Sequence, residues 1–322
     1  MLYASSGGFF FLFETLLYIY PSIPSNMAPY PTHCDHTLTG HKEPISQVRY
    51  NKSGQYCVSG GRDRTVRLWN PTTGMELHKY MGHGRDVLGV SVSPDNAKLA
   101  SCGVDRAVIL WDVGTGEILR RYTAHWERVN GVDFNDQGTV LVSGSFDATV
   151  RIWDCRSSNF SPIQVLEDCK DSVMSIQVRD VEIVAGSADG RVRRYDLRNG
   201  QLSEDYIGPA ITSARLSHDG NCVLVSTLDD TVRLMDKSNG TLLNEFTGHK
   251  HKEFKVESVM SNTDAYAVSG SEDGHIHIWD VLEGNKVETL KSHDTVVTSV
   301  DYHPSDVAIV TAGDDGAIRV WS

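Results

Sequence analysis

A repeat of about 42 residues constrains this chain more than any other feature of its sequence. Seven large side chains mark the repeat, at spacings of 42, 42, 42, 40, 44 and 42 residues: Trp69, Trp111, Trp153, Tyr195, Met235, Trp279 and Trp321. An aspartate stands six residues before every one of these marks. A period of this length indicates small units that each bury part of their surface against the next. The 322 residues therefore predict one repetitive domain rather than two unrelated ones.

Each unit contains short runs rich in Val, Ile, Thr and aromatic residues, such as TVRLW at 65–69 and TVRIW at 149–153. Turn-forming stretches such as SPDN, FNDQG and LSHDG separate these runs, so each unit is predicted to hold four short strands. Together with an upstream Gly-His and a closing Trp-Asp, this pattern resembles the WD40 repeat family over residues 36–322. The resemblance implies an all-β fold, a seven-bladed WD40 β-propeller.

The end of the chain predicts how the ring closes. After Trp321 only Ser322 remains, so the last unit cannot supply its own outer strand. The segment DHTLTGH at 35–41 has the pattern of such a strand, with no unit before it. We therefore expect this N-terminal strand to pair with the last blade and remove its open edge.

Residues 1–34 are expected to form an N-terminal extension outside the propeller of residues 35–322. The apolar run FFFLFETLLYIY at 9–20 is too short to span a bilayer, and no Lys or Arg precedes it as in a signal peptide. No membrane association is therefore expected. Met27 is an alternative start, so residues 1–26 are interpreted as a disordered tail or an extension of the gene model.

Five repeats carry a set of polar side chains that imitates a Ser-His-Asp catalytic site. A catalytic site occurs once, whereas a structural device recurs in each repeat. We interpret each set as a chain of hydrogen bonds from indole to hydroxyl to imidazole to carboxylate, because buried polar groups need partners. The sets are His41, Ser59, Asp63, Trp69; His83, Ser101, Asp105, Trp111; His125, Ser143, Asp147, Trp153; His249, Ser269, Asp273, Trp279; and His293, Thr311, Asp315, Trp321. No catalytic residue is assigned, and the chain is not expected to be an enzyme.

The fourth and fifth repeats lack this set and keep only Asp189 and Asp229. Cys169, Ala185 and Tyr195 replace the other members in one repeat, and Ile207, Val225 and Met235 replace them in the other. When both ends of a polar network are lost together, no buried polar group is left without a hydrogen-bond partner. We expect apolar packing to hold these two blades.

Charge and cysteine content limit the classes of function. The chain has 42 acidic and 30 basic residues, a net charge of -12, which disfavours nonspecific binding to nucleic acid phosphates. Direct DNA binding is not expected. Six cysteines without a CxxC pair predict a reducing compartment, cytoplasm or nucleus. His275 and His277 have no third ligand at a suitable spacing, so neither a metal nor a cofactor is expected.

Residues that the repeat does not explain are candidates for partner binding. Trp126 follows His125, and Phe146 precedes Asp147, in loops expected on the same face of the ring. Exposed aromatic residues beside arginine are typical of interaction hot spots. The full candidate set is Trp126, Arg128, Phe146, Arg62, Arg85, Arg106 and Phe254. The alternatives are aromatic rings folded onto their own blade and, around Phe254, a solvated charge run.

Two four-residue boxes suggest a different partner. Trp153-Asp-Cys-Arg156 and Tyr195-Asp-Leu-Arg198 resemble the WD-x-R box of cullin-4 ubiquitin-ligase substrate receptors. The resemblance implies that Arg156 and Arg198 engage the ligase adaptor. Pairing of each arginine with the preceding aspartate is the alternative, since a local ion pair needs no partner.

The fourth and fifth repeats, which depart from the general WD40 pattern, indicate a more specific group within the WD40 family. AGSADGRVRRYDLRNGQL at 185–202, RIWDCRS at 151–157 and DKSNGTLLNEFTGHKHKEFKVES at 236–258 resemble the mitogen-activated protein kinase organizers among WD40 proteins. That resemblance implies a scaffold for kinase-cascade components in the cytoplasm that also associates with splicing factors in the nucleus. We expect a single monomeric ring within larger protein complexes.

Overall fold

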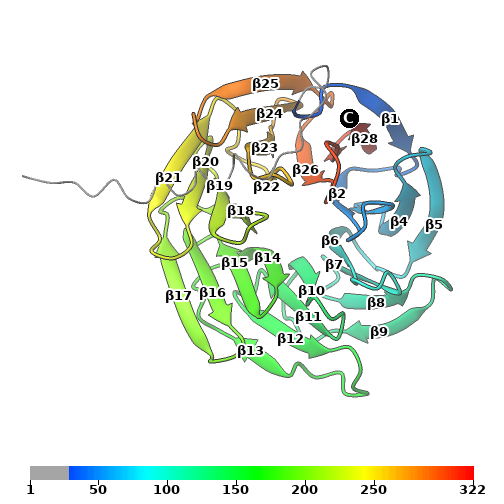
Figure 1. The fold of residues 1–322 in the computed structure, drawn as a ribbon. Helices are drawn as coiled ribbons and strands as arrows, with labels where there is room; N and C mark the ends of the chain where they lie inside the picture. Colours follow the sequence, from blue (N-terminus) through cyan, green and yellow to red (C-terminus); the bar gives the residue numbers. More distant parts are fainter. Residues whose placement is uncertain (1–28) are drawn as a thin grey trace, which may run out of the picture.

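The structure is a computed structural model that describes residues 29–322. These residues form seven four-stranded antiparallel sheets arranged as blades around a common centre (Figure 1). The expectations for residues 1–26, including the alternative start at Met27, lie outside the described residues. Within the described part, no helix is long and apolar enough to cross a membrane. The predicted seven-bladed propeller is confirmed.

The strands of each blade follow one another from the innermost to the outermost. Blade 1 contains β2 (Ile45–Tyr50), β3 (Cys57–Gly61), β4 (Thr65–Asn70) and β5 (Met75–Met81). Blade 2 contains β6 (Val87–Val92), β7 (Lys98–Gly103), β8 (Val108–Asp112) and β9 (Ile118–Tyr122). Blade 3 contains β10 (Val129–Phe134), β11 (Val140–Ser145), β12 (Val150–Asp154) and β13 (Gln164–Leu166).

The remaining blades follow the same plan. Blade 4 contains β14 (Val173–Arg179), β15 (Glu182–Ser187), β16 (Arg191–Asp196) and β17 (Gln201–Tyr206). Blade 5 contains β18 (Ile211–Leu216), β19 (Cys222–Thr227), β20 (Thr231–Asp236) and β21 (Leu242–Thr247). Blade 6 contains β22 (Ser258–Met260), β23 (Tyr266–Gly270), β24 (His275–Asp280) and β25 (Lys286–Lys291). Blade 7 combines β26 (Val297–Tyr302), β27 (Ile309–Gly313) and β28 (Ala317–Trp321) with β1 (Cys34–Thr39).

The N-terminal strand closes the ring, as the sequence predicts. β1 pairs antiparallel with β28, and Leu38 stands opposite Ile318 (Figure 1). Contacts with blade 7 include residues before the predicted boundary at residue 35, since the backbone N–H groups of Thr32 and His33 both donate to the carbonyl of Ser322 at 3.0 Å. Tyr30 also packs edge-on against Tyr266. Residues 32–34, which the sequence analysis assigned to the extension, therefore belong to blade 7.

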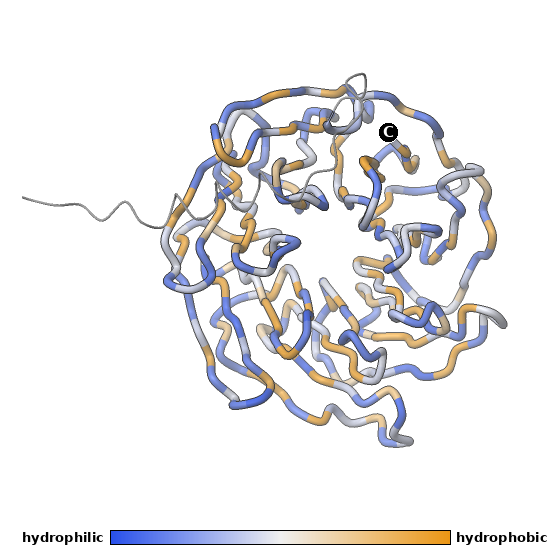
Figure 2. Tube along the Cα trace, in the orientation of Figure 1, coloured by the Kyte–Doolittle hydropathy of each residue, from blue (hydrophilic) through white to orange (hydrophobic). Residues whose placement is uncertain are grey.

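The core lies between the faces of neighbouring blades. Seven buried apolar clusters alternate with the seven sheets, and one of them joins Tyr122 of blade 2 to Trp153 of blade 3. Hydrophobic residues are interspersed with hydrophilic ones all round the ring (Figure 2). Successive side chains of a strand point to opposite faces of its sheet, so inner strands such as β3 and β27 are buried on both faces between the neighbouring blades.

The turn between the second and third strands is shared by every blade. The residue after each repeated aspartate has a left-handed backbone: Arg64, Arg106, Ala148, Gly190, Asp230, Gly274 and Gly316, with φ between 60° and 82°. This tight turn holds the aspartate beside the loop that enters the blade. Both connections emerge on the same side of the ring, which we call the upper face. The opposite side is the lower face.

Candidate protein-interaction site

The hydrogen-bond chain is formed in four of the five predicted blades. In blade 3, Trp153 Nε1 donates to Ser143 Oγ at 2.9 Å, Ser143 Oγ lies 2.8 Å from His125 Nε2, and His125 Nδ1 lies 2.9 Å from Asp147 Oδ2. The same three contacts, at 2.7 to 3.2 Å, link the sets in the other blades: His41, Ser59, Asp63 and Trp69; His83, Ser101, Asp105 and Trp111; and His293, Thr311, Asp315 and Trp321.

The electrostatics of blade 3 fit a neutral imidazole between hydroxyl and carboxylate. Burial lowers the pKa of His125, although Asp147 opposes this shift. Burial would raise the pKa of Asp147, but hydrogen bonds from His125 and Thr149 hold it below its usual range. The hydroxyl of Ser143 is fully buried between its two partners. Such a hydroxyl acts as a link between strands, since no substrate can reach it.

The prediction for blade 6 is wrong. Trp279 Nε1 donates to the carbonyl of Thr247 at 3.1 Å, and Ser269 Oγ donates to the carbonyl of Gly270 at 2.9 Å. Asp273 contacts His275 instead of His249. The physical reason is spacing: His249 precedes Ser269 by 20 residues, whereas His125 precedes Ser143 by 18. The longer loop carries the imidazole out of register with the hydroxyl.

A cluster of buried histidines replaces the chain in blade 6. The ring of His249 packs against the rings of His251, His277 and Trp279 at centroid distances of 5.5 to 6.3 Å. Both ring nitrogens of His249 lack a hydrogen-bond partner among the described residues. Within the same part of the chain, no group of three or more His, Cys, Asp or Glu residues is arranged to hold a metal ion.

The expectation of apolar packing in blades 4 and 5 is confirmed but incomplete. Cys169, Ala185 and Tyr195 lie in one buried apolar cluster, and Val225 and Met235 lie in another. Each blade also contains an arginine–aspartate pair that the sequence analysis did not predict.

Arg193 is fully buried and its Nη2 lies 2.8 Å from Asp189 Oδ2, while its Nη1 donates to Ser187 Oγ at 2.8 Å. Blade 5 uses Arg233, whose Nη2 lies 2.7 Å from Asp229 Oδ2. The signal was present in the sequence, because an arginine two residues before the mark recurs at Arg67, Arg151, Arg193, Arg233 and Arg319.

On the upper face of blade 3 the structure brings together the aromatic candidates. The side chain of Trp126 is 73% exposed, and that of Phe146 is 46% exposed. The guanidinium of Arg128 stacks over the ring of Phe146 at 4.4 Å, a cation–π contact. The backbone N–H of Phe146 donates to the carbonyl of Arg128 at 2.9 Å, so the two loops are tied together. We call Trp126, Arg128, Phe146 and Arg106 the blade 3 patch.

The scaffold itself fixes this patch. Asp147 Oδ2, which holds His125, also accepts the backbone N–H of Trp126 at 3.0 Å. From blade 2, Arg106 Nη1 donates to the carbonyl of Trp126 at 3.2 Å. Trp126 is thus held on both sides of its peptide unit while its indole stays exposed. A pre-positioned aromatic side chain loses little conformational entropy when a partner binds.

The other upper-face candidates do not join the blade 3 patch. Arg62 lies on blade 1 and pairs with Asp314 of blade 7 at 3.6 Å. Arg85 is exposed on the loop that enters blade 2. Phe254 is 41% exposed on the blade 6 loop, whose backbone N–H groups at 252, 253 and 254 all donate to Glu272 Oε1. That loop is therefore ordered by one carboxylate.

The two WD-x-R arginines lie on the lower face, in the turns after β12 and β16. The side chains of Arg156 and Arg198 are 69% and 72% exposed. Each pairs with its own box: Arg156 Nε with Asp154 at 3.2 Å, and Arg198 Nη2 with Asp196 at 3.3 Å. The two arginines are therefore accessible to a partner, and each also forms the predicted ion pair with the aspartate of its own box.

Comparisons with known proteins agree with this architecture. A family model described as "IFT122 first beta-propeller" matches residues 31–278, and one described as "WD domain, G-beta repeat" matches residues 284–322. WD repeat domain-containing protein 83 of Homo sapiens is 52% identical over 285 residues, which cover 88% of this chain and 90% of the human protein. The protein of the same name from Danio rerio is 53% identical over 299 residues, 92% of this chain and 95% of its own length.

A more distant relative extends the similarity to fungi. An uncharacterized WD repeat-containing protein of Schizosaccharomyces pombe is 46% identical over 277 residues, 85% of this chain and 93% of its own. All three alignments span nearly the whole propeller. The chain therefore belongs to the family of WD40 repeat proteins that includes WD repeat domain-containing protein 83.

Proposed function

We propose that this protein is a non-catalytic scaffold that binds partner proteins through the blade 3 patch on its upper face. The observation that carries the proposal is the exposed indole of Trp126, held in place by Asp147 and Arg106 beside the stacked pair of Arg128 and Phe146. Aromatic and arginine side chains supply most of the binding energy in many protein interfaces. A monomeric ring with several loops on each face can hold different partners at once.

A scaffold explains the polar groups better than an enzyme does. The serine, histidine and aspartate of blade 3 are bonded to one another, and the same arrangement recurs in three further blades. A nucleophile must be reachable by its substrate, whereas Ser143 is fully buried. These residues stabilise the blade that carries the patch.

The resemblance to mitogen-activated protein kinase organizers supports a choice of partner class. We propose kinase-cascade components in the cytoplasm and splicing factors in the nucleus as the proteins assembled on the ring. The acidic net charge of -12 favours partners with basic docking surfaces over direct contact with nucleic acid. The exposed aromatic patch would then supply the apolar centre of an interface with a charged rim.

The experiment is affinity purification from the protein's own cells, followed by identification of the proteins that co-purify. Trp126→Ala combined with Phe146→Ala is expected to remove at least one kinase-cascade component or splicing factor while the ring stays folded. The matched control is Tyr206→Ala on β17, because Tyr206 is 66% exposed and also stacks with an arginine, Arg191, at 4.9 Å. An unchanged set of co-purifying proteins in the double variant would refute the blade 3 patch.

A second candidate function rests on the lower face. A cavity of about 400 Å³ lies between blades 3 and 4, and its lining includes Val140, Val178, Val181 and Leu197, beside Arg198. An apolar recess beside the turn that carries Arg198, with Arg156 exposed on the same face, fits the docking of a cullin-4 ligase adaptor. Arg156→Ala with Arg198→Ala would then abolish co-purification of ligase subunits. Under the scaffold function alone, the same variant keeps all its partners, so the two functions are separated by one measurement.

A further inference from the structure

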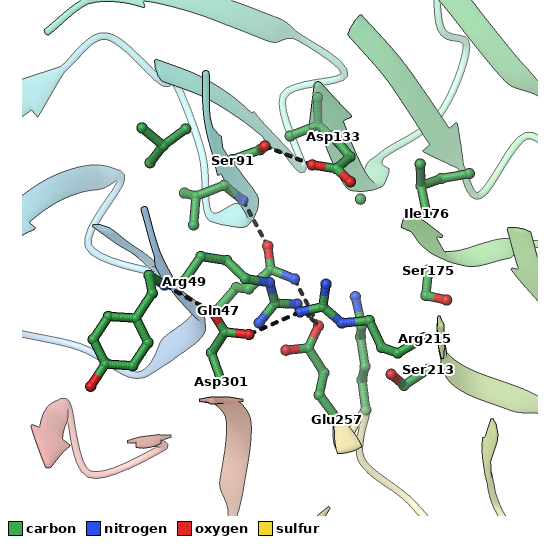
Figure 3. A pocket seen from close by; sticks show the side chains of 16 residues that line it. Gln47, Arg49, Ser91, Asp133, Ser175, Ile176, Ser213, Arg215, Glu257 and Asp301 are labelled. Carbon is green, nitrogen blue, oxygen red and sulfur yellow. Dashed lines mark hydrogen bonds and ion pairs between the residues drawn. The ribbon is translucent and has the colours of Figure 1, made fainter. Parts of the chain in front are cut away.

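A charged cavity lies at the centre of the ring, apart from both docking surfaces. Its volume is about 180 Å³, and the innermost strands of six blades and the blade 6 loop line it. Figure 3 shows Arg49, Arg215, Glu257 and Asp301 converging on it from different blades. The charged lining residues are Arg49, Asp133, Arg215, Lys255, Glu257 and Asp301. The formal charges cancel, so the distribution of hydrogen bonds decides which ligand the cavity favours.

The carboxylate of Glu257 is already saturated by the protein. Gln47 Nε2 and Arg49 Nη2 each donate to Glu257 Oε1 at 2.7 Å, and Ser299 Oγ donates to Oε2 at 2.5 Å. Burial would raise the pKa of Glu257, but Arg49 and Lys255 hold it below its usual range. This carboxylate is ionised and has little capacity left for a cation from outside.

The two aspartates are also bonded within the fold. Asp133 accepts the hydroxyl of Ser91 at 2.8 Å and the backbone N–H of Val178 at 2.9 Å. Asp301 accepts the backbone N–H of Tyr50 at 2.8 Å. These bonds join neighbouring inner strands, so the carboxylates serve to link the blades.

Of the three cations, Arg49 is bonded to Val48, Ser299 and Glu257, whereas Lys255 and Arg215 make fewer hydrogen bonds than their donors allow. Lys255 Nζ reaches across the centre of the ring to the carbonyl of Asn130 at 3.0 Å, and no carboxylate of residues 29–322 lies within ion-pair distance of it. Arg215 has one long contact, from Nη2 to Asp301 at 3.4 Å. An ammonium and a guanidinium each carry more donors than these contacts use.

The electrostatics agree with this imbalance. Burial lowers the pKa of Lys255; the charge of Glu257 opposes this shift, and the charges of Arg49 and Arg215 add to it. Burial, followed by the charge of Arg49, lowers the pKa of Arg215. Cations that repel one another in a partly buried cavity gain from a shared anion, because the anion replaces lost hydration with charge-assisted hydrogen bonds.

We propose that the central cavity binds a single tetrahedral oxyanion, a phosphate or phosphate monoester, between Lys255 and Arg215. The cavity has room for about six water molecules, enough for one phosphate group but not for a whole nucleotide. A phosphate presents several acceptor oxygens to both cations. The anion comes either from solution or from the phosphorylated side chain of a partner. This site is independent of the blade 3 patch, so either proposal can fail alone.

The test measures binding of inorganic phosphate and of O-phosphoserine to the full chain by calorimetry, at constant ionic strength set with chloride. Wild-type protein is expected to bind inorganic phosphate and to melt at a higher temperature in its presence. Binding of phosphoserine with similar affinity assigns the site to a phosphate monoester, and binding of inorganic phosphate alone assigns it to the free anion. Absence of binding to both ligands overturns the proposal.

Variants locate the binding. Lys255→Gln is expected to weaken phosphate binding at least about tenfold, because it removes a charge-assisted hydrogen bond. Lys170→Gln removes the same charge from an exposed loop position and is expected to bind like wild type. Arg215→Gln should weaken binding similarly. If Arg215→Gln does not fold, Lys255→Gln decides alone, since Lys255 forms no ion pair in the described chain. Equal affinity in Lys255→Gln and wild type would place any bound phosphate elsewhere and refute the site.

Discussion

The carboxylate of Asp147 holds Trp126 in place: Asp147 Oδ2 accepts the backbone N–H of Trp126 at 3.0 Å. The same oxygen lies 2.9 Å from His125 Nδ1. One side chain thus joins the polar network inside blade 3 to the exposed aromatic residue on its surface. Stability of the blade and geometry of the docking surface are therefore coupled through Asp147.

Asp147→Ala tests this coupling. The change leaves the imidazole of His125 and the N–H of Trp126 without their acceptor, which is expected to reduce the free energy of unfolding by about 1–3 kcal/mol. Proteins that depend on the blade 3 patch should also be lost from affinity purifications. Urea unfolding measures the first effect. The control is Glu127→Ala, an exposed carboxylate in the same loop, which should change neither. A destabilised variant that keeps all its partners would separate the two roles.

Ser143 and Ser269 occupy equivalent positions but make different contacts. Ser143→Ala leaves the indole N–H of Trp153 and Nε2 of His125 without a hydrogen-bond partner. The change is expected to lower the free energy of unfolding by about 2–4 kcal/mol. Ser269→Ala removes only a bond to the carbonyl of Gly270 and is expected to cost about 1 kcal/mol. Chemical denaturation of the two variants checks the difference. Equal losses would mean that blade 6 does contain a working hydrogen-bond chain.

Arg193 should be one of the most sensitive positions of blade 4. Arg193→Ala leaves Asp189 in a largely buried place without its cation, at an expected cost of about 3–5 kcal/mol. Arg191→Ala on the same strand removes a more exposed pair with Glu204 and is expected to cost less than about 1 kcal/mol. Thermal melting of both variants makes the comparison. Similar melting temperatures would show that apolar packing alone holds this blade and that the buried ion pair adds little.

The histidine cluster of blade 6 predicts a dependence of stability on pH. Burial, with the neighbouring histidines, lowers the pKa of His249 to about 4, and burial lowers the pKa of His277 to about 4. An unfolded histidine titrates near 6.5. Between pH 6.5 and about 4, these histidines are protonated in the unfolded chain but neutral in the folded chain. The free energy of unfolding therefore falls as the pH decreases over this range. Each histidine contributes a slope of up to about 1.4 kcal/mol per pH unit.

Denaturation curves across this range provide the measurement. His249→Gln with His277→Gln is expected to reduce the slope of the curve between pH 6.5 and 4. The remaining slope comes from His125, His251 and His293, whose pKa values burial also lowers. The carboxylates of the hydrogen-bond chains add their own loss only below the usual range for aspartate, since the pKa values of Asp63, Asp147 and Asp315 are lowered. A wild-type curve that stays flat down to pH 4 would show that the cluster does not resist protonation.

The sequence by itself determined the ring. The 42-residue period, the alternating strand pattern and the missing last strand fixed the number of blades and the closure by β1, because every unit must bury its faces against its neighbours. It also identified Trp126 and Phe146, since they stand outside the repeat. The sequence also contains a signal for Arg193 and Arg233 of blades 4 and 5, because an arginine stands two residues before the mark in five of the seven repeats.

Only the tertiary structure decided which polar groups meet. A shift of two residues in the loop after His249 broke a hydrogen-bond chain whose members are all present, because hydrogen bonds tolerate errors of only a few tenths of an ångström. Lys255 stands in a charge run on the blade 6 loop, yet its ammonium crosses the centre of the ring to Asn130, 125 residues away. Contacts between residues so far apart in sequence depend on how the blades close around the centre, and no local pattern encodes that geometry.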